Sequence, residues 1–351
     1  MKVRQIIVAT VLNGFNGERS IYGAFHLLKG KKSAQTIQDG ALFGLNSYFG
    51  LFPEITRAEV EADVCELIEN GQVTLLEQDR YVLTKLGQVA LRESQDKNPY
   101  IRDLRGWQYH SYTEEVWLRI SLFVQALTNI TSGIKRFYPI THDVRVQAWV
   151  KNHLPTKGRQ AFQKALYNEL FEFLSSCNQK QALLFVHQLS GMNQIGLTRL
   201  QLAEKLGVSL EEVNLYHVST IHRLLYALEE NEGTFSYLSI FSKDLKKEFV
   251  LTQSARLTYE LLEEGKTLES ISRIRHLKQS TIEDHIVEIA ISNRQFSIKA
   301  FVPEEIEESI LRFANTSQTS RLRELKDKLE PEVSYFMIRL VLARKKVNDE
   351  T

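Results

Sequence analysis

The sequence predicts a mainly α-helical protein with one short β-hairpin in its N-terminal part. Apolar residues recur every three to four positions through most of residues 107–250 and 251–346, which is the period of an amphipathic helix. Two short strands are expected at Val73–Leu76 and Tyr81–Thr84, on either side of Glu77–Arg80. With 351 residues and 43% hydrophobic content, the chain is long enough to bury two or three cores.

Residues 1–93 are predicted to form a winged-helix-like module. Thr56 is expected to cap an amphipathic helix that Asn70-Gly71 ends, after which the hairpin and a further helix follow. The turn of the hairpin carries Glu77 and Asp79, and these carboxylates would repel phosphate. We therefore expect this module to have a structural or protein-docking role rather than to contact DNA.

A polar, charged linker is predicted at 94–106, followed by a helical domain at 107–250. Within that domain, residues 197–221 fit a second helix-turn-helix, because Ala203 lets two helices approach and Gly207 allows a left-handed turn. The helix after this turn begins with two glutamates, which form a poor surface for phosphate. A folded scaffold is the expected role of this second motif.

Positive charge is concentrated in residues 100–164, which hold ten Lys and Arg against four Asp and Glu, whereas the whole chain has a formal net charge of +1. All three tryptophans also lie in this segment. Basic residues interleaved with aromatics can hold a single strand by phosphate contacts and base stacking, although large aromatics in helical domains are more often core. We expect this segment to contribute more to DNA affinity than the C-terminal motif. Its predicted DNA-binding residues are Lys135, Arg136, Arg145, Lys151, Lys157 and Arg159.

Residues 255–290 fit a helix-turn-helix, a motif that usually handles nucleic acid. Gly265 is expected to end the first helix, and Ser280 is expected to cap the third, with Glu283 as its capping-box partner. The buried positions expected on the three helices are Leu257, Leu261 and Leu262, then Leu268 and Ile271, then Ile282, Ile286 and Ile289.

The start of the last helix in such a motif is exposed and can enter a major groove. Two further helices, opened by Pro303 and Pro331, are expected to cover the motif, and the second ends in Arg344-Lys345-Lys346. The predicted DNA-binding residues of the motif are Arg273, Arg275, Lys278, Gln279, Ser280 and Thr281.

The chain resembles a known family at SISRIRHLKQSTIEDHI and, downstream, at VSYFMIRLVLA. It is similar to the helicase-associated helix-turn-helix domain found at the C-terminus of some bacterial RecQ-type DNA helicases and in stand-alone bacterial proteins of the YpbB type. The most specific positions are Arg275, Ser280-Thr281-Ile282 and His285-Ile286. The pattern of residues 30–53 and 55–73 is also similar to the RecQ C-terminal winged-helix domain. The resemblance implies association with DNA unwinding and repair.

No sequence pattern predicts catalysis, a cofactor or a metal site. Gly30-Lys31-Lys32-Ser33 looks like part of a phosphate loop, but Phe25 stands where the first glycine belongs. Cys65 and Cys177 form no CxxC pair, so neither zinc nor a disulfide framework is indicated, and a reducing cytoplasm is expected. The apolar run Ile6–Leu12 predicts a core helix or strand rather than a secretory leader, and no run approaches the ~20 apolar residues of a membrane span.

The leading interpretation is a non-catalytic, cytoplasmic DNA-binding adaptor that works with a separately encoded RecQ-type helicase in DNA repair or recombination. Residues 1–93 are the expected docking surface for the helicase. One alternative is a helix-turn-helix transcription regulator, which would prefer a palindromic site. The other is a protein-binding scaffold, which would show no affinity for DNA. The preferred DNA structure and the oligomeric state are left open.

Overall fold

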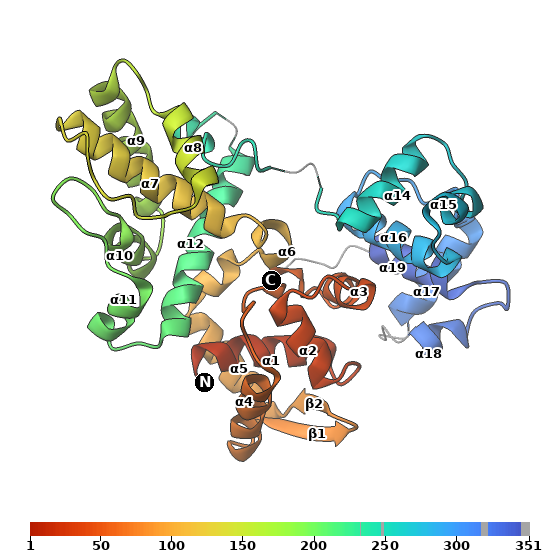
Figure 1. The fold of residues 1–351 in the computed structure, drawn as a ribbon. Helices are drawn as coiled ribbons and strands as arrows, with labels where there is room; N and C mark the ends of the chain where they lie inside the picture. Colours follow the sequence, from red (N-terminus) through yellow and green to blue (C-terminus); the bar gives the residue numbers. More distant parts are fainter. Residues whose placement is uncertain (232, 247–248, 317–321, 345–351) are drawn as a thin grey trace. The chain divides into compact units, whose positions relative to one another are not determined.

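The computed structural model describes residues 1–231, 233–246, 249–316 and 322–344. Within these ranges the protein is mainly α-helical and contains a two-stranded antiparallel sheet, so the predicted fold class is confirmed (Figure 1). The chain forms two compact units. Unit 1 contains Met1–Ile6 and Leu91–Lys246, and unit 2 contains Ile7–Ala90 together with the described part of 249–344. Unit 2 is therefore built from two segments that are far apart in the sequence.

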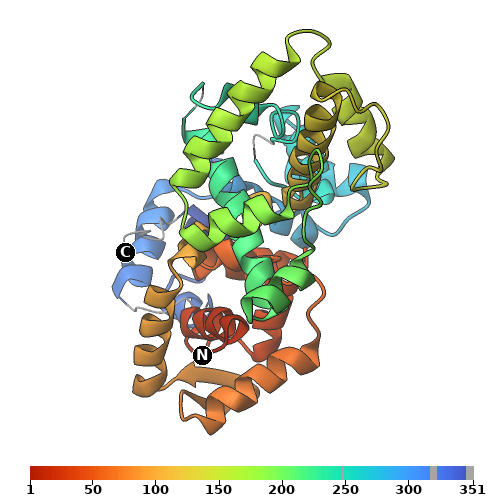
Figure 2. The same ribbon diagram turned by 90° about the vertical axis from the view of Figure 1, so that its left-hand side faces the viewer.

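Unit 1 is built around two long helices, α7 (Thr113–Thr131) and α12 (Leu210–Glu230), whose apolar residues share one core. Its helices are seen from a second direction in Figure 2. The remaining elements are η2 (Pro99–Asp103), α6 (Gly106–Tyr109), α8 (Val144–His153), α9 (Arg159–Ser175), α10 (Gln179–Gln188), α11 (Arg199–Leu206) and α13 (Ser236–Ser239).

The predicted linker at 94–106 is ordered as the end of α5 (Lys85–Lys97), η2 and the start of α6. Tyr100, Ile101 and Leu104 are buried there, and the Tyr100 ring stacks on Tyr216 of α12 at 3.8 Å between centroids. The charged side chains of Asp96, Lys97 and Arg102 nearby are exposed. The segment is thus polar in composition and part of the core at the same time.

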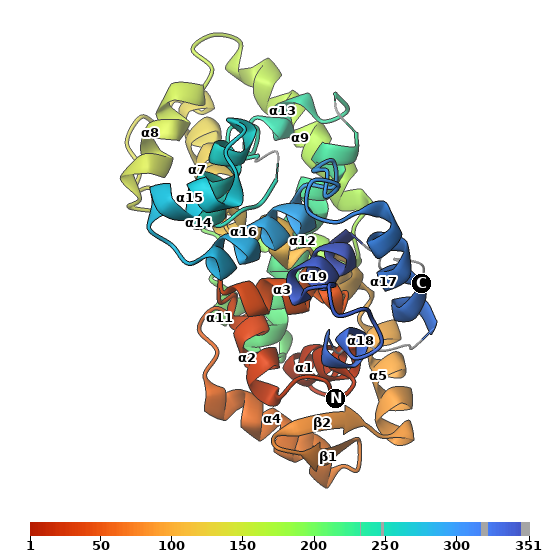
Figure 3. The same ribbon diagram turned by 90° about the vertical axis from the view of Figure 1, so that its right-hand side faces the viewer.

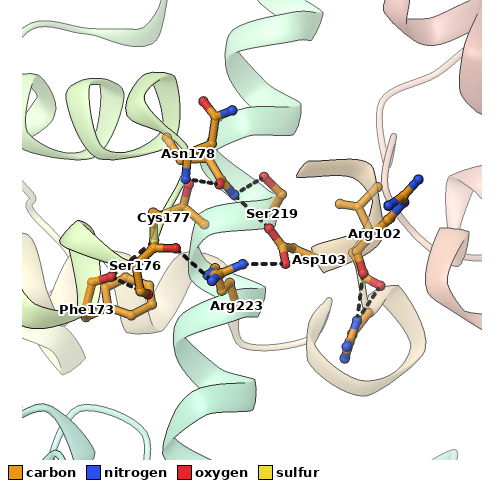
Figure 4. A network of polar contacts seen from close by, with 12 residues as sticks. Arg102, Asp103, Phe173, Ser176, Cys177, Asn178, Ser219 and Arg223 are labelled. Carbon is orange, nitrogen blue, oxygen red and sulfur yellow. Dashed lines mark hydrogen bonds and ion pairs between the residues drawn. The ribbon is translucent and has the colours of Figure 1, made fainter. Parts of the chain in front are cut away.

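A polar network also fixes this segment to the helices of unit 1 (Figure 4). The Asp103 carboxylate accepts from Arg223 Nη1 at 3.2 Å and from Gln181 Nε2 at 3.1 Å. Arg223 Nη2 donates to the carbonyl of Ser176 at 2.8 Å, and Gln181 Nε2 also donates to Ser219 Oγ at 3.1 Å. The Asp103 carboxylate therefore connects η2 with α10 and α12, and Arg223 extends the network to the end of α9.

The N-terminal residues of unit 2 form α2 (Ile21–Lys29), α3 (Ala34–Leu42), η1 (Asn46–Tyr48), α4 (Arg57–Glu69), β1 (Val73–Glu77) and β2 (Arg80–Leu83), after α1 (Val3–Phe15), which begins in unit 1. The predicted cap at Thr56 is confirmed. Its side chain accepts from the Glu59 amide, and the Glu59 carboxylate accepts from the Thr56 amide. The hairpin pairs Val73 with Leu83, close to the expected strands. The run Ile6–Leu12 lies in α1 and is mostly buried.

The C-terminal residues of unit 2 form α14 (Gln253–Glu263), α15 (Leu268–Arg275), α16 (Gln279–Ser292), α17 (Glu304–Thr316), α18 (Leu322–Lys326) and α19 (Tyr335–Arg344). Lys345 and Lys346, expected at the end of the last helix, lie outside the described residues. Figure 3 shows α3 beside α16 and α19, and Leu42 of α3 packs against the core of these helices. The N-terminal and C-terminal parts of unit 2 therefore share an interface. No helix in the described ranges is long and apolar enough to cross a membrane.

Candidate nucleic-acid interface

Three helices, α14, α15 and α16, form the predicted helix-turn-helix. Thr252 caps α14 by accepting from the Ala255 amide, and Thr267 caps α15 by accepting from the Ser270 amide. Gly265 has a φ of +76° just after α14, as its predicted role as a helix stop requires. The turn between α15 and α16 is His276–Lys278, and His276 itself takes the left-handed conformation with a φ of +52°.

The third helix begins earlier than the sequence predicted. Lys278 is the N-cap residue of α16 and makes no side-chain cap, whereas Ser280 already lies inside the first turn. Glu283 accepts from Gln279 Nε2 at 3.2 Å. The expected Ser280–Glu283 capping box is therefore wrong, because the turn is shorter than the position of the serine suggested.

Most of α16 is buried. Ile282, Ile286 and Ile289 are fully buried as predicted, and the helix is enclosed by α14, α15, α19 and α3. Only its first turn, with Gln279 and Ser280, is exposed. The exposed side chains of α16 therefore lie at its N-terminal end, and Glu283 and Asp284 of the next turn are half-buried.

The buried stripe of α14 differs from the predicted one. Leu257 is 47% exposed, whereas Ala255 and Thr258 are fully buried, and Leu261 and Leu262 are partly buried. The residues of α14 that pack on α16 are Ala255, Thr258 and Leu262. Their spacing is that of a helix, but one of them is a threonine. A search for large apolar residues alone misses this face.

Arg275 is half-buried, and its guanidinium is directed at α14. Its Nη1 donates to the Ser254 carbonyl at 2.6 Å and to Thr258 Oγ1 at 2.5 Å, and its Nη2 donates to Ser254 Oγ at 3.0 Å. Thr258 in turn contacts His285 Nδ1 at 2.9 Å. We call Ser254, Thr258, Arg275 and His285 the arginine cluster. This cluster joins all three helices, so Arg275 is engaged in the fold rather than placed for a phosphate.

Electrostatics inside the arginine cluster favour a neutral histidine. Burial lowers the pKa of His285, and the positive charge of Arg275 lowers it further. Burial also lowers the pKa of Arg275. Because Nδ1 of His285 faces the donors of the cluster, the neutral ring serves as a hydrogen-bond acceptor there.

A buried glutamate holds the N-cap residue of α14. Glu288 of α16 accepts from the Thr252 amide at 2.5 Å and from Thr252 Oγ1 at 3.0 Å, and burial raises its pKa. Sequence periodicity gave no sign of Glu288, Ser254 or Thr258, because their roles depend on contacts between helices. Their polar character alone made them resemble surface residues.

The other predicted residues of the motif lie at or near its surface. Arg273, Lys278, Gln279 and Ser280 are exposed, and Thr281 is half-buried. Arg273 makes only a long bond from Nε to the Glu269 carbonyl, at 3.4 Å. The structure therefore brings Arg273 and the start of α16 to one turn and removes Arg275 from the exposed set.

The predicted cations of the basic segment belong to unit 1. Two of them lie within α8, one begins α9 and three lie in the loops before and after α8, and all six are exposed. Arg145 pairs with Asp143 at 3.1 Å, and Arg159 donates to the Pro155 carbonyl at 2.8 Å. They and the helix-turn-helix lie in different units. The set is Lys135, Arg136, Arg145, Lys151, Lys157 and Arg159.

The second predicted helix-turn-helix is formed by α11 and α12. Gly207 has a φ of +64°, Ser209 caps α12, and Ala203, Val213 and Tyr216 are buried. Glu211 and Glu212 occupy the first turn of α12, as expected. The local motif is thus present, with acidic side chains where a DNA-contacting helix would need neutral or basic ones.

These observations define a mainly α-helical protein with a C-terminal helix-turn-helix domain. A family described as "Helix-turn-helix domain" matches residues 254–342. Protein YpbB of Bacillus subtilis (strain 168) is 33% identical over 341 residues, which cover 97% of this chain and 96% of that protein. The chain therefore belongs to the family of protein YpbB. No solved structure matches it.

Proposed function

We propose that this protein is a cytoplasmic DNA-binding adaptor that acts by binding rather than by catalysis. The observation that carries the proposal is the helix-turn-helix domain, whose third helix exposes only its first turn. Such motifs present this turn to DNA. Because α16 is enclosed beyond that turn, it has little surface to lay along a groove, and contacts to the phosphate backbone are favoured over base contacts.

The charge at this turn supports a phosphate contact. Lys278 is exposed at the N-terminal end of α16, where the helix dipole is already positive, so its charge does not stabilise the helix. Helix N-termini bind phosphate readily, and a lysine at the same place adds a second attraction. Arg273, exposed at the end of α15, contributes a third positive group.

Replacing both Arg273 and Lys278 with alanine is expected to weaken binding of duplex DNA about equally for all sequences. Each lost phosphate contact lowers the slope of log affinity against log salt by about one. Fluorescence anisotropy over a series of salt concentrations measures both effects. Lys299→Ala is the matched control, since this exposed lysine follows the far end of α16. Equal losses in the control and the double variant would contradict the proposed contact.

We also propose that the partner is a separately encoded RecQ-type helicase and that the process is DNA repair or recombination. The resemblance of residues 270–286 to the helicase-associated domain supports this, and so does the exposed apolar surface of the N-terminal part. Leu75 and Leu76 of β1 and Leu86 and Val89 of α5 are each more than half exposed. Exposed apolar side chains of this size favour a protein contact.

The helicase proposal is tested best with point variants, because α3 covers part of the C-terminal core and deleting the first 93 residues would uncover it. We expect Leu75→Glu combined with Leu86→Glu to abolish capture of a purified RecQ-type helicase from the same organism, while DNA affinity is retained. Ile195→Glu, at an exposed apolar position of unit 1, is the control. Capture of the helicase by the double variant would show that the docking surface lies elsewhere.

A protein-binding scaffold is the second candidate function. It is favoured by the arginine cluster, because two of the most specific positions of the resemblance, Arg275 and His285, serve packing. A scaffold requires no affinity for DNA. The same anisotropy titration separates the two functions.

A further inference from the structure

Unit 1 has a surface segment with almost no negative charge. Residues 116–168 include eight Lys and Arg and a single acidic residue, Asp143. Of the eight, only Arg119 is buried, where it is held by Glu115 and Asp244. Asp143 is engaged at the start of α8, where it caps the helix and pairs with Arg145. The seven exposed cations are Lys135, Arg136, Arg145, Lys151, Lys157, Arg159 and Lys164.

These cations lie on both sides of α8. The loop at 132–143 precedes this helix and the loop at 154–158 follows it, and the ten residues of α8 span about 15 Å. Arg145 and Lys151 are exposed on the helix between the two loops. The positive charge is thus distributed along an element rather than concentrated at one point, which suits an extended polyanion.

The loop before α8 presents a single aromatic ring to solvent. Tyr138 is 96% exposed, although the backbone on both sides of it is held in place. The side chain of the buried Gln125 donates from Nε2 to the Tyr138 carbonyl and accepts from the Ile140 amide, both at 3.0 Å. Phe137, the preceding residue, packs against the core of unit 1. The fold therefore fixes the loop and leaves the ring free.

The two tryptophans of this segment are engaged in the fold. Trp117 is buried and packs edge-on against Phe185. The Arg119 guanidinium lies 4.5 Å from the ring centroid of Trp149, and the ring of His153 stacks on Trp149 at 4.0 Å. Packing in the fold thus explains the positions of both tryptophans, but it does not explain the exposed ring of Tyr138. An exposed ring beside Lys135 and Arg136 is the combination that holds unpaired bases.

We propose that the loop containing Tyr138 binds single-stranded nucleic acid, with the ring stacked on a base and Lys135 and Arg136 on the adjacent phosphates. A duplex offers no free base face for such stacking, so the ligand is a single strand or the single-stranded part of a junction. This inference rests on the proposed nucleic-acid binding and assigns it a second contact surface, separate from the helix-turn-helix. The protein then holds duplex and single strand with different units.

The test measures binding of the full-length protein to fluorescein-labelled oligothymidine of about 20 nucleotides and to a blunt duplex of equal length. Tyr138→Ala is expected to weaken oligothymidine binding about tenfold, the size of one lost stacking contact, and to leave duplex binding within about twofold. Tyr138→Phe retains the ring and is expected to bind as the wild type does. Tyr167→Ala is the matched control, because Tyr167 is also an exposed tyrosine of unit 1 but stacks on Phe171.

Each outcome decides the inference. If the wild type binds both DNAs and Tyr138→Ala keeps its affinity for oligothymidine, this inference is overturned while the proposed function stands. The loop would then be a surface for a protein. Absence of binding to either DNA by the wild type would overturn both this inference and the proposed function. Loss in Tyr138→Ala together with loss of duplex binding in the Arg273 and Lys278 double variant would support both surfaces.

Discussion

Replacing Arg275 with alanine is expected to destabilise the helix-turn-helix by about 2–3 kcal/mol, because hydrogen bonds from a charged group are worth more than neutral ones and their buried acceptors are left unpaired. The guanidinium holds the Ser254 carbonyl of α14 and the side chain of Thr258, which contacts His285 of α16. Loss of this one side chain removes a polar contact that all three helices share. A DNA-binding defect in Arg275→Ala would then follow from unfolding.

Hydrogen exchange measured by mass spectrometry tests this prediction locally. Amides of α14 and α16 are expected to exchange faster in Arg275→Ala, whereas those of α7 and α12 in unit 1 keep their wild-type rates. Arg273→Ala serves as the control, since Arg273 is exposed only two residues away and should change stability by less than about 0.5 kcal/mol. Identical exchange in the two variants would show that the arginine cluster does not hold the motif together.

Acid is expected to unfold unit 1 because His222 is buried in its neutral form. Its Nδ1 accepts from the Arg105 amide at 2.9 Å and its Nε2 lies 3.1 Å from Thr113 Oγ1. Burial, with smaller contributions from Arg105 and His110, lowers the pKa of His222 to about 3. Burial lowers the pKa of His217, five residues earlier on α12, as well. Both rings are therefore uncharged in the folded protein at neutral pH.

The direction of the effect follows from proton uptake. In the unfolded chain a histidine binds its proton near pH 6.5, whereas folded His222 does so only near pH 3. Its contribution to stability is therefore complete above about pH 6.5 and is lost as the pH falls toward 3. The loss is about 1.4 kcal/mol for each pH unit, and approaches 5 kcal/mol at the acid end.

Tryptophan fluorescence reports this transition selectively, since Trp107, Trp117 and Trp149 all belong to unit 1. Urea midpoints are expected to fall steeply between pH 6.5 and 4.5 in the wild type. His222→Gln keeps hydrogen-bonding groups without taking up a proton, so its midpoint should be lower at neutral pH and depend less on acid. His142→Gln, at an exposed histidine, is the control. A midpoint that falls equally in all three proteins would contradict this assignment.

Local features of the fold were predictable from sequence because they depend on neighbouring residues. The Thr56 capping box, the hairpin and the glycine turns at 207 and 265 arise from spacing within a few positions. Contacts between distant segments were not predictable in this way. Nothing in the sequence of α3 indicates that it packs on α16, and the apolar residues of the expected linker gave no sign that Tyr100 would stack on Tyr216.

The candidate site shows the same division. The position of the helix-turn-helix and its buried isoleucines followed from periodicity. The role of Arg275 did not, because an arginine near a turn is equally suited to a phosphate and to a helix terminus, and only the position of Ser254 and Thr258 decides between them. The sequence does not distinguish Tyr138 from the other aromatics of the basic segment. The structure does, because Trp117 and Trp149 are packed in the fold.

The central claim, that this protein binds DNA through the first turn of α16, is tested most directly by its affinity for a forked DNA across a series of salt concentrations. The wild type is expected to bind with an affinity that falls linearly with salt on logarithmic axes. The Arg273 and Lys278 double alanine variant should bind more weakly, with a slope lower by about two. No binding of the wild type at low salt, or the same slope for both proteins, would contradict the claim.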